Sequence, residues 1–165
     1  MQSLADIYKS HHQRIRRTIY RIQGDEGLDD LVQDAFLKAW AKRKSFRDQS
    51  LVTTWIYRIA THVAIDALRK RQDRVSYSFD DERDGQVKSY DLTLARQVRQ
   101  AVACLPEKQR VVMVLFYFEE LALSEIAEIL QIPAGTVKSR LHSAKESVQT
   151  LLESKGDQVG QKMAK

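Results

Sequence analysis

Apolar residues recur at helical intervals along most of the chain. The first stripe has members three or four positions apart and predicts an amphipathic helix that ends at Gly24 and Gly27. Its members are Leu4, Ile7, His11, Ile15, Ile19 and Ile22. A second helix follows, for which Asp29 or Asp30 can provide the N-terminal cap. Its predicted buried face consists of Val32, Ala35, Phe36, Ala39 and Trp40.

A third helix is predicted from about Val52, after a polar break at residues 45–50. Its expected buried residues and its basic end are Trp55, Ile59, Val63 and Ala67, then Arg69, Lys70 and Arg71. Residues 76–93 lose the apolar period and contain Gly85 and four aspartates. This composition predicts a flexible linker between two domains.

The helical pattern returns after the linker. Leu94, Val98 and Ala101 form one stripe. Pro106 suits the first turn of the next helix, because an N–H at that position would have no partner within the helix. That helix is expected to bury Val111, Val112, Leu115 and Phe116.

The last two predicted helices are separated by a turn that carries Pro133 and Gly135. The first, about Leu123 to Leu130, is expected to bury Ile126, Ala127 and Leu130. The second is expected to bury Val137, Leu141, Ala144, Val148 and Leu151. No strand-like alternation of useful length occurs, so the pattern predicts an all-α fold. Its expected parts are two small helical domains, 1–75 and 94–155, with the linker 76–93 between them and a disordered tail at 156–165.

The distribution of charge adds to this picture. The 165-residue chain has a formal net charge of +5. Residues 1–75 hold 15 lysines and arginines against 9 aspartates and glutamates, whereas the linker holds 2 against 5. Basic segments beside an acidic one suit a polyanionic partner, or else a solvated lysine-rich surface. The single cysteine and the absence of a signal-like or membrane-spanning apolar run predict a cytoplasmic protein without membrane insertion.

The last helix has a polar face opposite its apolar stripe. A helix-turn-helix places such a face in the major groove of DNA, which is wide enough for a helix. Thr136 can cap the helix and reach a phosphate, Lys138 can donate to guanine or phosphate, and Lys145 can hold the DNA backbone. The candidate DNA-reading residues are Thr136, Lys138, Ser139, Arg140, His142, Ser143 and Lys145. The alternative is a plain helical hairpin with a solvated face.

Two blocks of the sequence resemble the extracytoplasmic-function (ECF) sigma factors of bacteria. Asp29 to Arg71, with DDLVQDAFLKAW and TWIYRIATHVAIDALRK, is similar to sigma region 2, and Leu105 to Val148, with GTVKSR, is similar to sigma region 4. The resemblance covers roughly Leu4 to Leu152. It implies a non-catalytic subunit that binds the clamp helices and flap of core RNA polymerase. Region 2 would melt the −10 element of promoter DNA, and region 4 would read the −35 element.

The resemblance also implies roles for residues of region 2. The expected polymerase-docking residues are Asp30, Gln33, Asp34 and Lys38, while Phe36 and Trp40 of the same helix are expected in the core. The loop 45–52 is expected to capture a flipped base, with Phe46, Arg47, Asp48, Gln49 and Ser50 as its candidates; alone it would read as an ordinary connection. The cations expected to follow phosphates of the melted DNA are Arg58, Arg69, Lys70 and Arg71.

The helix-turn-helix departs from the family's pattern at several positions. Ala122 stands where relatives usually have a polar cap, whose loss costs about 1 kcal/mol, although Ser124 can cap a helix that starts later. Gln131 stands where a glycine usually makes the turn, and a left-handed backbone there carries a penalty of roughly 1 kcal/mol. His142 and Ser143 stand where relatives often have bulky or basic residues, so the promoter sequence does not transfer from any relative.

The resemblance further implies an anti-sigma factor as a partner and a monomeric free protein. No cofactor and no metal site are expected, because adjacent His11 and His12 point different ways on a helix and Asp80 to Glu82 lack a calcium-loop pattern. A free-standing helix-turn-helix regulator would explain 94–152 and leave region 2 without a task. An enzyme acting on nucleic acid is a third hypothesis, but the sequence has no Gly-rich phosphate loop or nucleophile motif.

The acidic linker gives one more hypothesis. When DNA is absent, the segment Asp80 to Asp91 would lie on the basic face of residues 58–71. The alternative is that these carboxylates are merely solvated.

Overall fold

The computed structural model describes residues 4–43, 52–75 and 90–163, with side chains at 6–43, 52–71 and 94–153. Every regular element in these ranges is helical, which confirms the all-α prediction. The elements are α1 (Leu4–Gln23), α2 (Leu28–Lys42), α3 (Val52–Val75), α4 (Tyr90–Ala103), α5 (Glu107–Met113), η2 (Val114–Phe118), α6 (Leu123–Leu130) and α7 (Ala134–Met163). No helix in the described part of the chain is long and apolar enough to cross a membrane.

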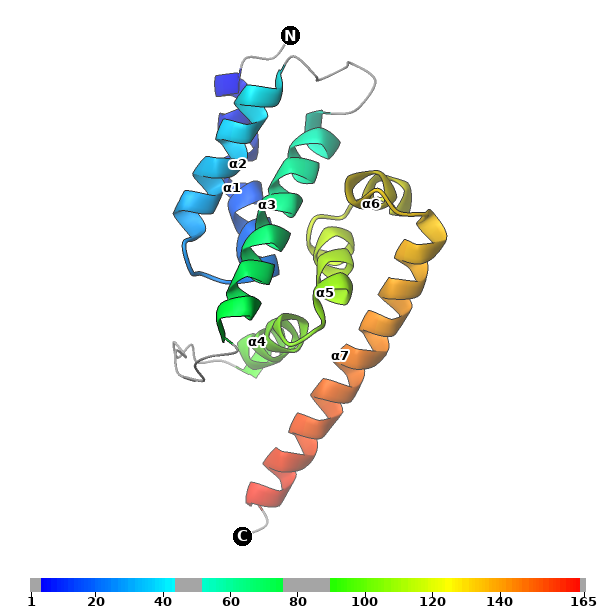
Figure 1. Ribbon diagram of the computed structural model, residues 1–165. Coiled ribbons are helices and arrows are strands. Elements are labelled where there is room, and N and C mark those ends of the chain that lie inside the picture. Colours follow the sequence, from blue (N-terminus) through cyan, green and yellow to red (C-terminus); the bar gives the residue numbers. More distant parts are fainter. Residues whose placement is uncertain (1–3, 44–51, 76–89, 164–165) are drawn as a thin grey trace.

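The first three helices form a bundle, called here the N-terminal module (Figure 1). Ile15, Ile19 and Ile22 of α1 are fully buried, as the stripe predicts. They share a core with one face each of α2 and α3. That core also contains Val32, Ala35, Phe36, Ala39, Ile56, Tyr57, Ala60, Val63 and Ala64.

Two predictions for α2 were wrong. The helix begins at Leu28 with Gly27 at the N-cap, in a left-handed conformation (φ 63°) and without a side-chain cap. Asp29 and Asp30 lie instead in its first turn, where carboxylates favour the positive end of the helix dipole. Trp40 is 48% exposed rather than buried. It lies at the edge of the stripe near the helix end, and the Arg43 guanidinium covers its ring at 4.0 Å from the centroid.

Helices α4 to α7, including η2, form the C-terminal module. Its helix-turn-helix confirms the predicted bounds of α6, and Val137, Leu141 and Ala144 of α7 are buried as expected. Two other expectations differ. Helix α4 begins at Tyr90, inside the segment expected as linker, and Leu94 is 60% exposed because α4 buries its later residues. Helix α7 continues to Met163, into the segment 156–165 for which the sequence predicts a disordered tail.

Two of the departures from the family's pattern lie at the two ends of α6. Ala122 is the N-cap of α6, and no side chain caps this helix, so Ser124 does not take that role. The Glu125 carboxylate compensates in part, because it accepts a hydrogen bond from the Ala122 N–H at 2.8 Å. Gln131 ends α6 in the left-handed region, with φ 54° and ψ 44°. The strained backbone expected at this position is therefore present.

The two modules pack against each other. Helix α6 packs against α3, and α1 contacts both α5 and η2 (Figure 1). The buried side chains of both modules form one continuous hydrophobic cluster. The chain thus has a closed arrangement, which the helical pattern of the sequence does not predict.

Replacing Gln131 by glycine should stabilise the protein by about 1 kcal/mol, because glycine adopts the left-handed conformation without a Cβ clash. Urea denaturation followed by circular dichroism measures the change. Gln13→Gly, at an exposed site inside α1, is the matched control and should cost about 1 kcal/mol. A loss of stability in Gln131→Gly would mean that the turn carries no strain.

Candidate functional site

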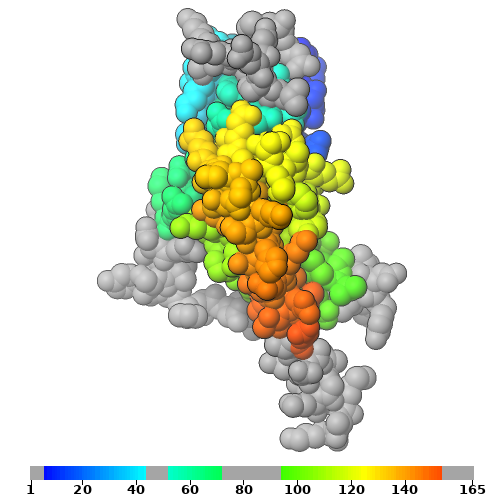
Figure 2. Space-filling model, turned by 90° about the vertical axis from the view of Figure 1, so that its right-hand side faces the viewer, coloured from blue at the N-terminus to red at the C-terminus, as the bar shows by residue number. Residues whose placement is uncertain are grey.

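The outer side of α7 faces solvent along its first four turns (Figure 2). Lys138, Ser139, His142, Ser143 and Lys145 are exposed, and Thr136 and Arg140 are partly exposed. All seven predicted DNA-reading residues therefore lie on one short helical segment that is held to the module by its buried stripe.

Three local contacts organise this face. The Ser139 hydroxyl donates to the Thr136 carbonyl at 3.0 Å, and His142 Nδ1 lies 3.4 Å from the Glu146 carboxylate. Lys145 extends over the Tyr117 ring, 5.7 Å from its centroid, so it reaches the edge of the face. The prediction that Thr136 caps the helix was wrong. The helix begins at Ala134, and the Pro133 carbonyl accepts from the Thr136 N–H.

The predicted cations of α3 do not form a free basic surface. Arg58 Nη2 lies 2.9 Å from the Glu128 carboxylate, and Arg69 makes a two-pronged pair with Glu107 at 2.7 and 2.9 Å. Arg71 donates to the Gln23 carbonyl. Lys70 is exposed. The base-capture candidates Phe46 to Ser50 and the linker residues Asp80 to Ser89 lie outside the described residues, as does the side chain of Asp91.

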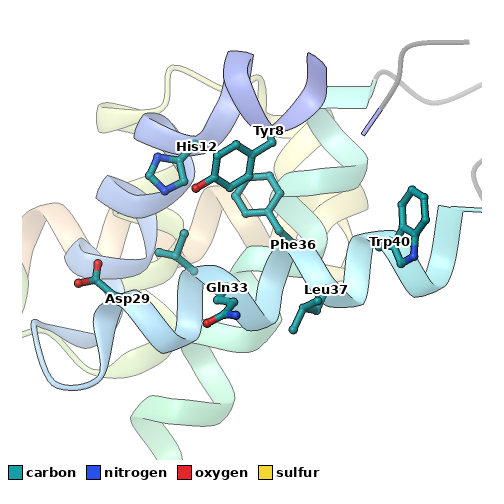
Figure 3. A pocket seen from close by; sticks show the side chains of 8 residues that line it. Tyr8, His12, Asp29, Gln33, Phe36, Leu37 and Trp40 are labelled. Carbon is teal, nitrogen blue, oxygen red and sulfur yellow. The ribbon is translucent and has the colours of Figure 1, made fainter. Parts of the chain in front are cut away.

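A groove of about 560 Å³ lies between α1 and α2 (Figure 3). The Tyr8 and Phe36 rings meet edge-on with centroids 4.7 Å apart, and His12 stacks beside them. Leu37 and Trp40 are 58% and 48% exposed and continue this surface along α2. Exposed apolar side chains in a row are typical of a protein-binding surface.

Of the four predicted docking residues, one lines this groove. Gln33 is part of its lining, and Asp29 lies at its end (Figure 3). Asp34 and Lys38 form an ion pair at 2.9 Å, and Asp30 is exposed. The sequence analysis missed Tyr8, His12 and Leu37 as members of the surface. Leu37 carried a signal, because it is a large apolar residue outside the buried stripe of α2.

A second groove of about 550 Å³ lies on the C-terminal module, between α4, η2 and α7. Most of its lining is apolar, and Lys145, Gln149 and Glu153 stand at its border. The apolar members are Val98, Val102, Met113, Tyr117, Phe118, Val148 and Leu152. This groove was not expected from the sequence, because its residues come from separate helices that the pattern of each helix alone does not bring together.

A carboxylate is buried where the two modules meet. Glu119, which follows η2, is 3% exposed. Tyr57 donates a hydrogen bond of 2.6 Å to its Oε2, and Arg21 Nη1 lies 3.0 Å from its Oε1. Burial, and then the hydrogen bond to Glu119, raise the pKa of Tyr57, so the phenol keeps its proton and remains the donor at neutral pH. Glu119 was not predicted from the sequence, because its partners lie far from it along the chain.

Comparisons with known proteins agree with this architecture. The family model for Sigma-70 region 2 matches residues 7–74, and that for Sigma-70 region 4 matches residues 95–148. The ECF RNA polymerase sigma factor SigW of Bacillus subtilis is 35% identical, over 91% of this chain and 89% of that protein. The ECF RNA polymerase sigma-E factor of Escherichia coli is 32% identical, over 84% of this chain and 80% of that protein.

Solved structures give the same result. The sigma factor RpoE of Bartonella quintana, in complex with the anti-sigma factor NepR, has a TM-score of 0.72 at 27% identity and covers 90% of this chain and 96% of its own. CnrH, in complex with the cytosolic domain of CnrY, has a TM-score of 0.70 at 22% identity, over 92% of this chain and 88% of its own, and shows the same fold.

The chain belongs to the sigma-70 family, in its ECF branch. Members of this family are initiation subunits that direct RNA polymerase to promoters. The N-terminal module is region 2, and the C-terminal module is region 4.

Proposed function

We propose that α7 reads the −35 element of the promoter. Support comes from the seven polar residues of its outer face, Thr136, Lys138, Ser139, Arg140, His142, Ser143 and Lys145, opposite a buried stripe that fixes the helix to its module. A helix held in this way enters the major groove without unfolding, and its cations gain phosphate contacts at the edges.

Region 2 recognises and melts the −10 element. The loop residues Phe46, Arg47, Asp48, Gln49 and Ser50 hold a flipped base, and Arg58, Arg69, Lys70 and Arg71 follow the phosphates of the separated strand. These cations lie on α3, whose buried face is part of the core of region 2. The packing of that face fixes the position of the helix and therefore of the cations. When they bind DNA, Arg58 and Arg69 exchange their carboxylate partners, Glu128 and Glu107, for phosphates.

The groove between α1 and α2 docks on the clamp helices of core polymerase. Leu37 and Trp40 provide its exposed apolar centre. Gln33 lies in its lining, and Asp30, Asp34 and Lys38 are the other polar residues of α2 that contact the clamp helices in this proposal. An apolar centre inside a polar rim is the usual anatomy of a binding energy hot spot. The groove of region 4 binds an apolar segment of the flap, and an anti-sigma factor competes for these surfaces.

The chain performs no covalent chemistry, and it works in the cytoplasm, where polymerase synthesises RNA. Each DNA-reading surface is small and binds weakly alone. When one polymerase holds both DNA-reading surfaces, binding of the first surface raises the effective concentration of the second at the promoter.

The observation that carries this function is the combination of a solvent-facing recognition helix on one module with an exposed apolar groove on the other. Run-off transcription with purified core polymerase and a genomic template library tests it. Promoter-dependent transcripts are expected only when the protein is added. Tight duplex binding without polymerase, together with no transcript, would favour a free-standing regulator instead.

Trp40→Ala should weaken binding to core polymerase by about tenfold or more, because truncating a central tryptophan of an interface costs more than 1 kcal/mol. Fluorescence anisotropy of labelled protein titrated with core enzyme gives the affinity. Tyr20→Ala is the matched control, since Tyr20 is an aromatic of similar exposure, 51%, on the surface of α1 outside the groove. Equal affinities for the two variants would remove the groove from the docking surface.

Lys138→Ala should weaken promoter binding by the holoenzyme and lower the slope of log affinity against log salt by about 1, if its ammonium contacts one phosphate. If Lys138 contacts a guanine, the loss is confined to promoters with that base. Filter binding at a series of salt concentrations measures both. Lys108→Ala removes an exposed lysine from α5 and should change neither.

A further inference from the structure

The contacts that close the two modules also neutralise cations of α3. Arg69 grips the Glu107 carboxylate with Nε and Nη2, at 2.9 and 2.7 Å. Arg58 Nη2 donates to both the side chain and the backbone carbonyl of Glu128, at 2.9 and 3.0 Å. A two-pronged guanidinium pair with a carboxylate uses the same donors in the same plane as a pair with a phosphate. Region 4 therefore presents carboxylates where melted DNA would present phosphates.

These two pairs do not hold the modules together by themselves. Both lie at the surface, with the Arg69 side chain 58% and the Glu128 side chain 50% exposed, and exposed pairs contribute little. The buried group at the interface is Glu119, and its side-chain partners come from the other module. Tyr57 and Arg21 contact it at 2.6 and 3.0 Å, and Arg14 Nε lies 3.8 Å away.

Arg21 links the modules a second time. Its guanidinium carbon lies 4.6 Å from the centre of the Phe118 ring, next to the ion pair with Glu119. The Arg21 side chain is 28% exposed and Glu119 is 3% exposed, so this pair is largely buried. Removing the charge of Glu119 would leave Arg21 without its counter-ion, which costs more than losing an exposed pair. The closed arrangement thus depends on this carboxylate far more than on the surface pairs.

The closed arrangement leaves one of the two proposed DNA-binding surfaces exposed. The recognition face of α7 stays open in the same arrangement (Figure 2). The effect is specific to α3, whose cations are proposed above to follow the −10 strand.

We propose that Glu119 latches the free protein closed, and that in this state Glu107 and Glu128 occupy Arg69 and Arg58 in place of DNA phosphates. The free chain then cannot engage a melted strand, and binding to polymerase, which separates the modules, releases these cations. This inference rests on the function proposed for α3. The hypothesis from the sequence assigned this role to carboxylates of the linker. In the present proposal, Glu107 and Glu128 of region 4 take that role.

The test uses the full-length protein without polymerase and a fluorescein-labelled single-stranded 20-mer, with binding followed by anisotropy. Glu119→Gln should bind about tenfold more tightly than the wild type, because the binding-competent open state gains population. Its salt slope should steepen by about 1.4, since two more phosphates are neutralised on a single strand. Small-angle X-ray scattering should show a larger radius of gyration.

Glu120→Gln is the matched control, because it removes the same charge one residue away from an exposed side chain. Arg21→Gln opens the latch from the other module. It removes a cation, which alone would weaken DNA binding, so tighter binding by this variant identifies opening as the cause. Circular dichroism establishes that each variant is folded, and Arg21→Gln decides the question if Glu119→Gln does not fold.

The double variant Glu107→Gln/Glu128→Gln separates mimicry from closure. It should bind the strand more tightly than Asp25→Asn/Glu120→Gln, a charge-matched pair at exposed sites, while its radius of gyration stays that of the wild type. If Glu119→Gln and Arg21→Gln match the wild type in both affinity and size, the latch is refuted. In that case, promoter-dependent transcripts from the wild type in the run-off assay would still support the proposed function. The absence of such transcripts would refute the proposed function, whatever the anisotropy shows.

Discussion

A carboxylate buried between two modules is the interaction on which the arrangement of this protein depends. A charged group leaves water only when partners replace its hydration, and Glu119 has a phenol and two guanidinium groups for that purpose. All three belong to region 2, whereas Glu119 belongs to region 4. The interface therefore favours one register, and one hydrophobic cluster extends across both modules.

The helices could largely be predicted from the sequence because each has its own apolar stripe. The bounds of α6 and the burial of Val137, Leu141 and Ala144 follow from spacing alone. The polar face of α7 follows as well, since whatever lies opposite a buried stripe must face outward. These features are local, and a period of 3.6 residues contains the information that they need.

The wrong predictions concern which residues of a helix are buried by other parts of the chain. Trp40 and Leu94 fit the stripes of their helices and yet are exposed, because Trp40 lies at the edge of its stripe and α4 buries its later residues. The reverse holds for Glu119, which is polar and nonetheless buried. Its burial depends on Arg14 and Arg21, about a hundred positions earlier in the chain, and no periodicity connects residues so far apart. The closed packing and both grooves escaped prediction for the same reason.

The π-helical turn η2 delivers Glu119 to the interface. The Glu119 N–H donates to the Val114 carbonyl, five residues back, so this turn contains one residue more than an α-helical turn would. Without that residue, the ordinary ladder would resume, and the carboxylate would rotate away from Arg21. Removing one residue from η2 would then separate the two modules as effectively as replacing Glu119 itself.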